Sequence, residues 1–265
     1  MVGDGSITML TAAGETRIDG IKEQVADLAG SALIDAPPIR GVGPIFMGGF
    51  RYDTQSIRDE IWRSFPYALM ILPRFLFSWS NSGTWLTINA LVEPGTNVRA
   101  LTETLLEDLQ LAVRGATSEG CQPVIKRITQ SSKEAWHNNV RSALHAIDAG
   151  ELTKVVLSRR KVLHADGNFS VDNALRRLCT EYPECTIFAI CNGATPEGLA
   201  CVDHGKLNVA CLASSAARGS NPEDDRQLQA QLFASQKERA EHSAVTEMVA
   251  GVLKDVCREL SYDIE

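Results

Sequence analysis

Three charged side chains lie in apolar stretches of the chain, where a charge needs a partner or a task. Lys154 lies in a β-branched run, Glu197 follows a proline in the turn ATPEGL, and Glu241 begins a helical pattern. A lysine and two carboxylates can together supply a general base, a general acid and a metal ligand. If the fold brings them together, they would suit acid–base chemistry on a small molecule with an oxygen-binding metal.

The run LTKVVLSRRKVLHA predicts a strand over 152–165. Strand alternation puts Lys154, Val156 and Ser158 on one face. Burial of that face would disfavour the ammonium form, so the lysine could act as a general base. The alternative is a lysine at the strand edge with its ammonium group in water.

The second carboxylate, Glu241, starts a stripe with helical spacing. The apolar members of this stripe are Ala244, Val245, Met248 and Val252. The stripe predicts a carboxylate on the inward side of a helix, where it requires a cation, a metal or a hydrogen-bond donor. The alternative is a carboxylate at the margin of the stripe, paired with Lys237 four residues earlier.

Local chemistry is less informative for Glu197, because Pro196-Glu197 also fits a simple solvated turn. His242 follows Glu241 directly, and adjacent helical residues point in different directions. We therefore interpret His242 as a packing or hydrogen-bonding residue rather than as a member of the set.

The elements that must position these residues indicate a mixed α+β fold with antiparallel hairpins. Two β-rich runs at 68–92 flank Ser80-Asn81-Ser82-Gly83, which predicts a hairpin. The segment IFMGGFRYD predicts a strand whose glycine pair allows close backbone packing. The first 45 residues, rich in Gly, Ala and Pro, predict a helical patch at about 20–30.

Four further segments have helical signals. Helical spacing at 98–113 places Leu101, Leu105, Leu109 and Ala112 on one face. The pair Ser131 and Glu134 forms a capping-box pattern for a helix that runs to Gly150. Ser170 is the predicted N-cap of a helix that ends before Pro183, and 224–260 is strongly helical.

Composition excludes several classes of function. The chain of 265 residues carries a net charge of −7 with a pI of about 5.3, so we expect no nucleic-acid or membrane partner. The apolar runs are too short to span a bilayer, and no secretory signal is recognised at the N-terminus. Seven cysteines without a C-x-x-C pair indicate reduced thiols, hence a cytoplasmic protein without a disulfide framework or zinc site.

Five motifs resemble, in the right order, those of the chorismate-utilising enzymes. They are GGFRYD (48–53), KVVLSR (154–159), GATPEGL (193–199), LASSAARG (212–219) and SQKERAEHSAV (235–245). The resemblance implies an α+β fold in which two similar halves form an antiparallel β-sandwich core with outer helices. It also implies a variable N-terminal segment at 1–45 and the N-terminal portion of a single catalytic domain at 46–265.

The resemblance further implies a magnesium-dependent conversion of chorismate to isochorismate, in menaquinone or siderophore synthesis. Lys154 would activate a water that attacks ring carbon 2, and Glu197 would protonate the hydroxyl leaving carbon 4. Glu241 would be a Mg²⁺ ligand. Ser214 and Ser215 match the loop that contacts the ring carboxylate. The lysine distinguishes the hydroxylating branch of the family from the aminating branch.

Two departures from the family pattern leave alternatives open. Ser214 stands where the family usually has glycine, and serine is less suited to close backbone approach. The sequence ends at Glu265, before the family's second metal-binding glutamate. We therefore expect the isolated chain, a monomer when full length, to be poorly active and prone to association. The alternatives are a non-catalytic chorismate-binding homologue or partner subunit, or a related salicylate- or anthranilate-type synthase.

Overall fold

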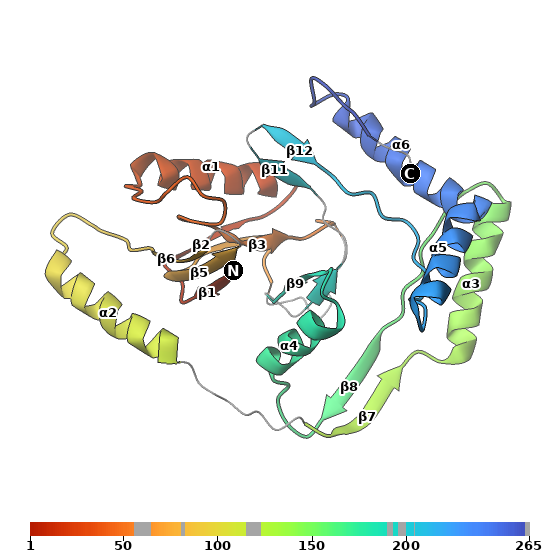
Figure 1. The fold of residues 1–265 in the computed structure, drawn as a ribbon, viewed down its shortest axis with the longest axis horizontal. Helices are drawn as coiled ribbons and strands as arrows, with labels where there is room; N and C mark the ends of the chain where they lie inside the picture. The colour runs from red at the N-terminus through yellow and green to blue at the C-terminus, as the bar shows by residue number, and fades with distance from the viewer. Residues whose placement is uncertain are drawn as a thin grey trace. The chain divides into compact units, whose positions relative to one another are not determined.

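The computed structural model describes residues 1–55, 65–80, 83–114, 123–189, 193–195, 200–203 and 205–262. Its contacts divide the chain into two units, Met1–Ser118 and Glu119–Glu265, and helices and strands occur in both (Figure 1). Every strand pair in these ranges is antiparallel. None of the helices in the same ranges has the length and apolar character needed to cross a bilayer.

The first unit contains two three-stranded sheets. One has the order β1 (Val2–Asp4), β5 (Phe75–Ser80), β6 (Gly83–Ile88), and the other β2 (Thr8–Ala12), β4 (Ala68–Leu72), β3 (Met47–Phe50). The β5–β6 pairing confirms the predicted hairpin, whereas β4 belongs to the other sheet. Pro73 and Arg74 separate β4 from β5, and proline cannot donate to a ladder. The first 45 residues contribute β1 and β2, which were not predicted.

Helix α1 (Arg17–Ser31) confirms the helical patch and covers the β2–β4–β3 sheet (Figure 1). Its Ile21 packs with Leu10 of β2 and Ala68 of β4, and all three side chains are buried. Val25 and Leu28 extend the contact from the same helix face. This cluster is the core of one half of the unit.

Gly48 confirms the close packing predicted for the glycine pair. A Cβ atom added at Gly48 would lie 1.9 Å from the carbonyl oxygen of Leu69 on β4. At Gly49 the same atom would meet nothing within 4 Å. Only the first glycine of the pair is therefore required by the β3–β4 contact.

Helix α2 (Val98–Arg114) confirms the helix predicted at 98–113. Its least exposed face carries Leu101, Leu105, Leu109 and Ala112. On the same face, Asp108 forms an ion pair with Arg74 at the β4–β5 corner. This ion pair joins α2 to the β4–β5 corner.

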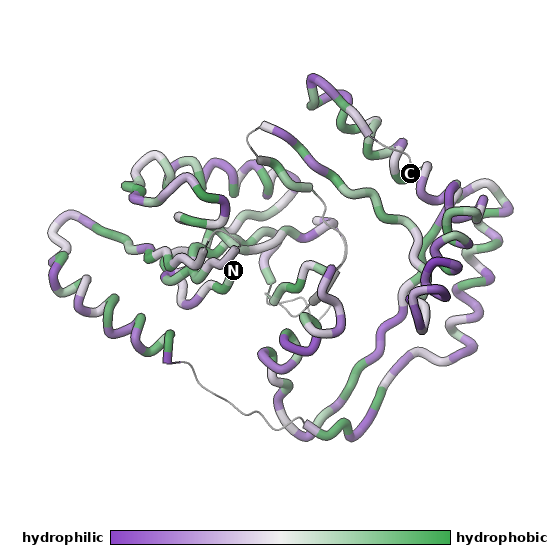
Figure 2. Tube along the Cα trace, viewed as in Figure 1, coloured by the Kyte–Doolittle hydropathy of each residue, from purple (hydrophilic) through white to green (hydrophobic). Residues whose placement is uncertain are grey.

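The second unit contains three strand pairs and four helices within its described residues. In chain order these are β7 (Ile125–Gln130), α3 (Lys133–Asp148), β8 (Lys161–Ala165), α4 (Val171–Glu181), β9 (Thr186–Phe188), β10 (Gly193–Thr195), β11 (Cys201–Asp203), β12 (Lys206–Asn208), α5 (Pro222–Ala234) and α6 (Gln236–Leu253). The predicted helical region 224–260 is thus two helices that meet at Ser235. Figure 2 shows that hydrophilic residues predominate along α5.

The predicted helix caps are confirmed except at one residue. Ser170 accepts a hydrogen bond from the Asn173 amide, and Gly150 follows α3 in a left-handed conformation with φ 73°. The N-cap of α3 is Ser132, whose side chain accepts from the Ala135 amide. The prediction of Ser131 was wrong by one residue, because either serine can cap and the helix begins at Lys133.

The predicted strand over 152–165 is wrong in its first part. Only Lys161–Ala165 forms a strand, and residues 151–160 are irregular. Strand β7 ends at Gln130 opposite Lys161, and α3 begins three residues later. Residues 152–160 therefore have no ladder partner within the described chain, and Lys154 lies outside any sheet.

An ion pair between Lys126 and Asp166 at the β7–β8 pair makes the stability of the fold depend on pH. Lys126 is the extra residue of a bulge, and its Nζ lies 3.0 Å from Oδ2 of Asp166, while the Val124 amide donates to Oδ1 at 2.8 Å. The hydrogen bond from Lys126, and then that from Val124, lower the pKa of Asp166. This carboxylate therefore stabilises the fold above the ordinary aspartate pKa of about 3.9.

We expect Asp166→Asn to lower the melting temperature at pH 7. The difference from the unaltered chain should disappear as the pH falls through the lowered pKa of Asp166, because the carboxylate is then protonated in both states. Melting curves at a series of pH values test this. Asp255→Asn, a change at another exposed carboxylate, is the control. A difference that stays constant across the acid range would contradict the prediction.

Candidate active site

Lys154 and Glu241 lie together, although 87 residues separate them in the sequence. Lys154 Nζ is 3.4 Å from Oε2 of Glu241, which lies in the second turn of α6. Their side chains are 46% and 31% exposed. The lysine is therefore half-exposed and ion-paired rather than buried on a strand face, and both side chains remain accessible to a ligand.

The alternative prediction, in which Glu241 pairs with Lys237, is wrong. Lys237 Nζ instead contacts Oε1 of Glu238, at 3.7 Å. The predicted stripe is also wrong in part, because Met248 and Val252 are 64% and 66% exposed. The inward side of α6 carries the buried residues Thr246 and Ala250, with the partly buried His242 one turn before them.

His242 links α6 to the segment that carries the two candidate serines. Its Nε2 lies 3.1 Å from the carbonyl oxygen of Cys211. Because a carbonyl only accepts, Nε2 carries the proton in this contact. The contact confirms the interpretation of His242 as a hydrogen-bonding residue. It also brings the start of the 211–219 loop next to the helix turn that holds Glu241.

The two candidate serines of the loop differ in their surroundings. Ser214 Oγ is buried and has no hydrogen-bond partner within the described residues. Ser215 is exposed. A ligand outside the protein can therefore reach the Ser215 hydroxyl, whereas the Ser214 hydroxyl is closed to solvent.

We expect Ser214→Ala to stabilise the chain by about 1 kcal/mol, because it removes a buried hydroxyl whose desolvation is not compensated by a hydrogen bond. Urea unfolding followed by circular dichroism measures the change. Ser215→Ala, at an exposed neighbour, should change the free energy of unfolding by less than about 0.5 kcal/mol. A loss of stability in Ser214→Ala would mean that this hydroxyl has a partner.

The end of the loop is held by a group of contacts that the sequence did not predict. Arg218 donates to Asp225 through Nε, at 2.9 Å to Oδ1, and through NH2, at 2.6 Å to Oδ2. The Gly219 amide donates to Oδ1 at 2.8 Å. The hydrogen bond from Arg218, followed by that from Gly219, lowers the pKa of Asp225, while the pKa of Arg218 is raised by Asp225.

One signal could have indicated this arrangement. Asn221-Pro222 is an N-cap followed by proline at the first helical position, and Asn221 Oδ1 accepts from the Glu223 and Asp224 amides. That start places Asp225 in the first turn, where it faces back toward the preceding loop. The pairing with Arg218 itself depends on the conformation of the loop.

Glu197 lies outside the described residues. Strand β10, which ends at Thr195, stops just before it. The prediction that Glu197 shares a site with Lys154 and Glu241 stays a prediction.

A metal ion held by protein side chains alone needs several ligands close together. Across the described ranges, no group of three or more His, Cys, Asp or Glu side chains could hold a metal ion. Mg²⁺ keeps several waters and is commonly bound by one or two protein carboxylates together with its substrate. Glu241 fits such an ion, because it is partly exposed and its contact with Lys154 engages Oε2.

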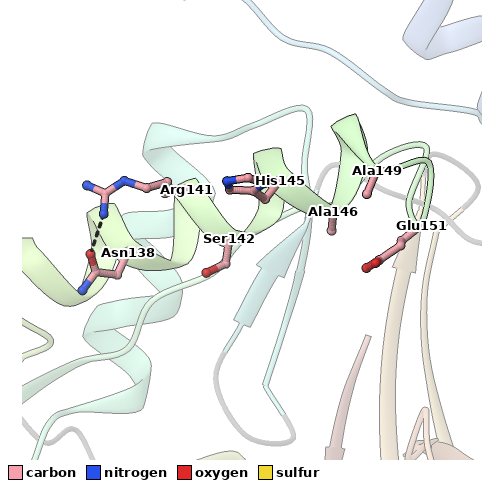
Figure 3. Close-up of a pocket in the computed structure, with 7 residues that line it drawn as sticks. All are labelled: Asn138, Arg141, Ser142, His145, Ala146, Ala149 and Glu151. Carbon is pink, nitrogen blue, oxygen red and sulfur yellow. Dashed lines mark hydrogen bonds between the residues drawn. The ribbon is translucent and has the colours of Figure 1, made fainter.

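A hollow of about 480 Å³ lies elsewhere in the second unit, along the C-terminal half of α3 (Figure 3). It is lined by Asn138, Arg141, Ser142, His145, Ala146, Ala149 and Glu151. The side chains of Arg141 and Asn138 are hydrogen-bonded to each other at 3.2 Å. The lining includes none of the described candidate residues, so the hollow is separate from the Lys154–Glu241 pair.

Comparison with known proteins identifies the family. Residues 1–265 match the family described as chorismate binding enzyme. The chain belongs to this family. It is 29% identical to isochorismate synthase MenF of Bacillus subtilis over 225 residues. These residues are 83% of this chain and 48% of the relative. It is also 26% identical to the salicylate biosynthesis isochorismate synthase of Pseudomonas aeruginosa over 259 residues. That match covers 94% of this chain and 53% of the relative.

Two solved structures support the fold. Anthranilate synthase component I from Streptococcus pneumoniae matches with a TM-score of 0.68 at 17% identity, over 93% of this chain and 59% of that one. A putative 2,3-dihydroxybenzoate-specific isochorismate synthase, DhbC, from Bacillus anthracis matches with a TM-score of 0.64 at 18% identity, over 98% and 58%. The predicted α+β fold class is confirmed. The chain spans about half the length of the curated relatives it matches.

Proposed function

We propose that the protein acts on chorismate as an isochorismate synthase. Water adds at ring carbon 2 and the hydroxyl at carbon 4 leaves as water, so substrate and product have the same composition. The observation that carries the proposal is the 3.4 Å contact between Lys154 Nζ and Glu241 Oε2. It joins two motifs of the family that lie far apart in the sequence, in a chain whose relatives include proteins named isochorismate synthase.

Lys154 is the proposed general base. Its amine must lie within hydrogen-bond reach of the attacking water, and its half-exposed position allows this. Glu241 contacts the same Nζ, so the lysine must give up its proton before it can act as the base. Proton removal by a positioned side chain accelerates such a step by about 10²–10⁴-fold.

Glu241 is the proposed protein ligand of Mg²⁺. When bound, the ion would supply positive charge for the ring carboxylate of chorismate. The 211–219 loop, joined to α6 by His242, would present Ser214 and Ser215 to that carboxylate. Since only Ser215 is exposed, we assign the direct hydroxyl contact to Ser215 and a backbone role to Ser214. Glu197 is the proposed proton donor to the leaving hydroxyl.

Isotope labelling tests the reaction. The chain is incubated with chorismate and Mg²⁺ in ¹⁸O-labelled water, and the products are separated and weighed by mass spectrometry. We expect isochorismate with one ¹⁸O at carbon 2. Enzyme concentrations near that of the substrate allow slow turnover to be seen. Unlabelled isochorismate would contradict attack by water.

The second candidate function is chorismate binding without turnover. The buried Ser214 hydroxyl favours it, because this serine occupies a position where close backbone approach is needed. Calorimetric titration with chorismate and Mg²⁺ separates the candidates: binding without product supports the second, and absence of both contradicts both. Salicylate with pyruvate, or anthranilate in the presence of ammonia, would instead identify a related synthase.

The cellular setting follows from composition. We propose a cytoplasmic protein, because seven cysteines without a C-x-x-C pair suit a reducing compartment. A monomeric state and a role in menaquinone or siderophore synthesis stay predictions.

A further inference from the structure

The 211–219 loop is attached to the second unit at both ends. At its start, the Cys211 carbonyl accepts a hydrogen bond from His242 of α6. At its end, Arg218 and Gly219 bind the carboxylate of Asp225 in the first turn of α5. The two candidate serines lie between these attachments. Because the loop contains no helix or strand, these contacts hold it where a ladder would otherwise do so.

The attachment at Asp225 is geometrically demanding. Arg218 makes a two-pronged contact with the carboxylate, which fixes the orientation of both groups. The Gly219 amide adds a third donor to the same carboxylate. A Cβ atom at Gly219 would lie 2.2 Å from the Asp225 amide nitrogen, so the backbone is pressed against the start of α5. We call this group of Arg218, Gly219 and Asp225 the loop clamp.

The loop clamp also determines what Arg218 can do. The Arg218 side chain is 86% exposed, and its exposed guanidinium would otherwise be an obvious partner for a carboxylate of the substrate. Asp225 occupies two of its donors. The arginine therefore acts on the loop, while three of its five N–H donors are not used by Asp225.

We propose that Asp225 is a positioning residue, which acts through Arg218 and Gly219 to set the backbone of Ser214 and Ser215 for binding the ring carboxylate of chorismate. The proposal rests on the proposed function, because it assumes that this loop contacts chorismate. Asp225 itself touches neither substrate nor metal. Its effect on binding comes from the conformation of the loop.

Hydrogen exchange tests the first half of the proposal without any ligand. In Asp225→Ala, amide exchange in peptides spanning 212–220 should become about tenfold faster, because a charged hydrogen-bond acceptor is lost. Glu223→Gln is the matched control, since it also removes an acid from the first turn of α5, at an exposed contact with Arg226. Arg218→Lys keeps the charge but loses the two-pronged contact, and should also accelerate exchange. Unchanged exchange in both clamp variants would overturn the proposal.

Chorismate affinity tests the second half. Calorimetric titration with Mg²⁺ present should give a dissociation constant about tenfold weaker in Arg218→Lys and Asp225→Ala than in Glu223→Gln, at similar free energies of unfolding. Faster exchange with unchanged affinity would overturn the positioning role and leave the proposed function intact. If the unaltered chain does not bind chorismate, the proposed function fails and the positioning role fails with it, while the exchange data still report on the clamp.

Discussion

Gly48→Ala is expected to destabilise the first unit by about 3 kcal/mol or more. The added methyl group would lie 1.9 Å from the Leu69 carbonyl oxygen, which belongs to the backbone of the central strand β4. A backbone atom inside a sheet cannot move aside as a side-chain end can, so β3 must separate from β4 or distort it. Both outcomes expose the sheet that α1 covers.

The neighbouring glycine provides the control. Gly49→Ala adds the same methyl group to the same strand, where nothing lies within 4 Å. It should change the free energy of unfolding by less than about 1 kcal/mol, since only the backbone preference of glycine changes. Urea unfolding of the three proteins gives both values. Equal effects at the two positions would show that strand propensity, and not the Leu69 contact, requires the glycine pair.

Lys154→Ala is expected to reduce isochorismate formation by at least about 100-fold, because it removes the proposed base. The fold should survive. The lysine is 46% exposed in its ion pair, and such surface pairs contribute at most about 1 kcal/mol to stability. Chorismate binding should remain nearly unchanged, since the carboxylate contacts come from elsewhere in the site.

Isochorismate formation and chorismate binding are measured on the same preparations of the unaltered chain and of each variant. Lys161→Ala is the control, because it removes an exposed lysine from β8, just after the same irregular segment. If Lys154→Ala loses chorismate binding while its circular dichroism spectrum is unchanged, the lysine contacts the substrate and is not the base. Turnover equal to that of Lys161→Ala would remove Lys154 from the mechanism altogether.

Features that depend on residues close together in the sequence could be predicted from the sequence alone. Ser170 could be recognised as a cap because its side chain serves an amide three residues away. The glycine pair indicated a close approach, which the structure places at Gly48. The least exposed face of α2 followed from helical spacing, because four residues on one face are enough to define it.

Features that depend on distant partners could not be predicted in this way. Among the residues that the structure describes, no strand pairs with the strand-like run around Lys154, because β7 pairs with β8. The exposure of Met248 and Val252 depends on what α6 packs against and not on its own spacing. The pairing of Lys154 with Glu241 could be predicted only from the family resemblance, since nothing local connects residues 87 positions apart.

The way in which β1 and β2 join their sheets has a consequence for biosynthesis. Val2 pairs with Phe77, and Thr8 pairs with Leu72. Both N-terminal strands therefore leave the ribosome well before the strands that complete their ladders, and they wait with open edges. Slow translation between residues 13 and 67 would prolong this exposed state. Aggregation during synthesis should therefore depend on the codons of this stretch more than on those that follow β5.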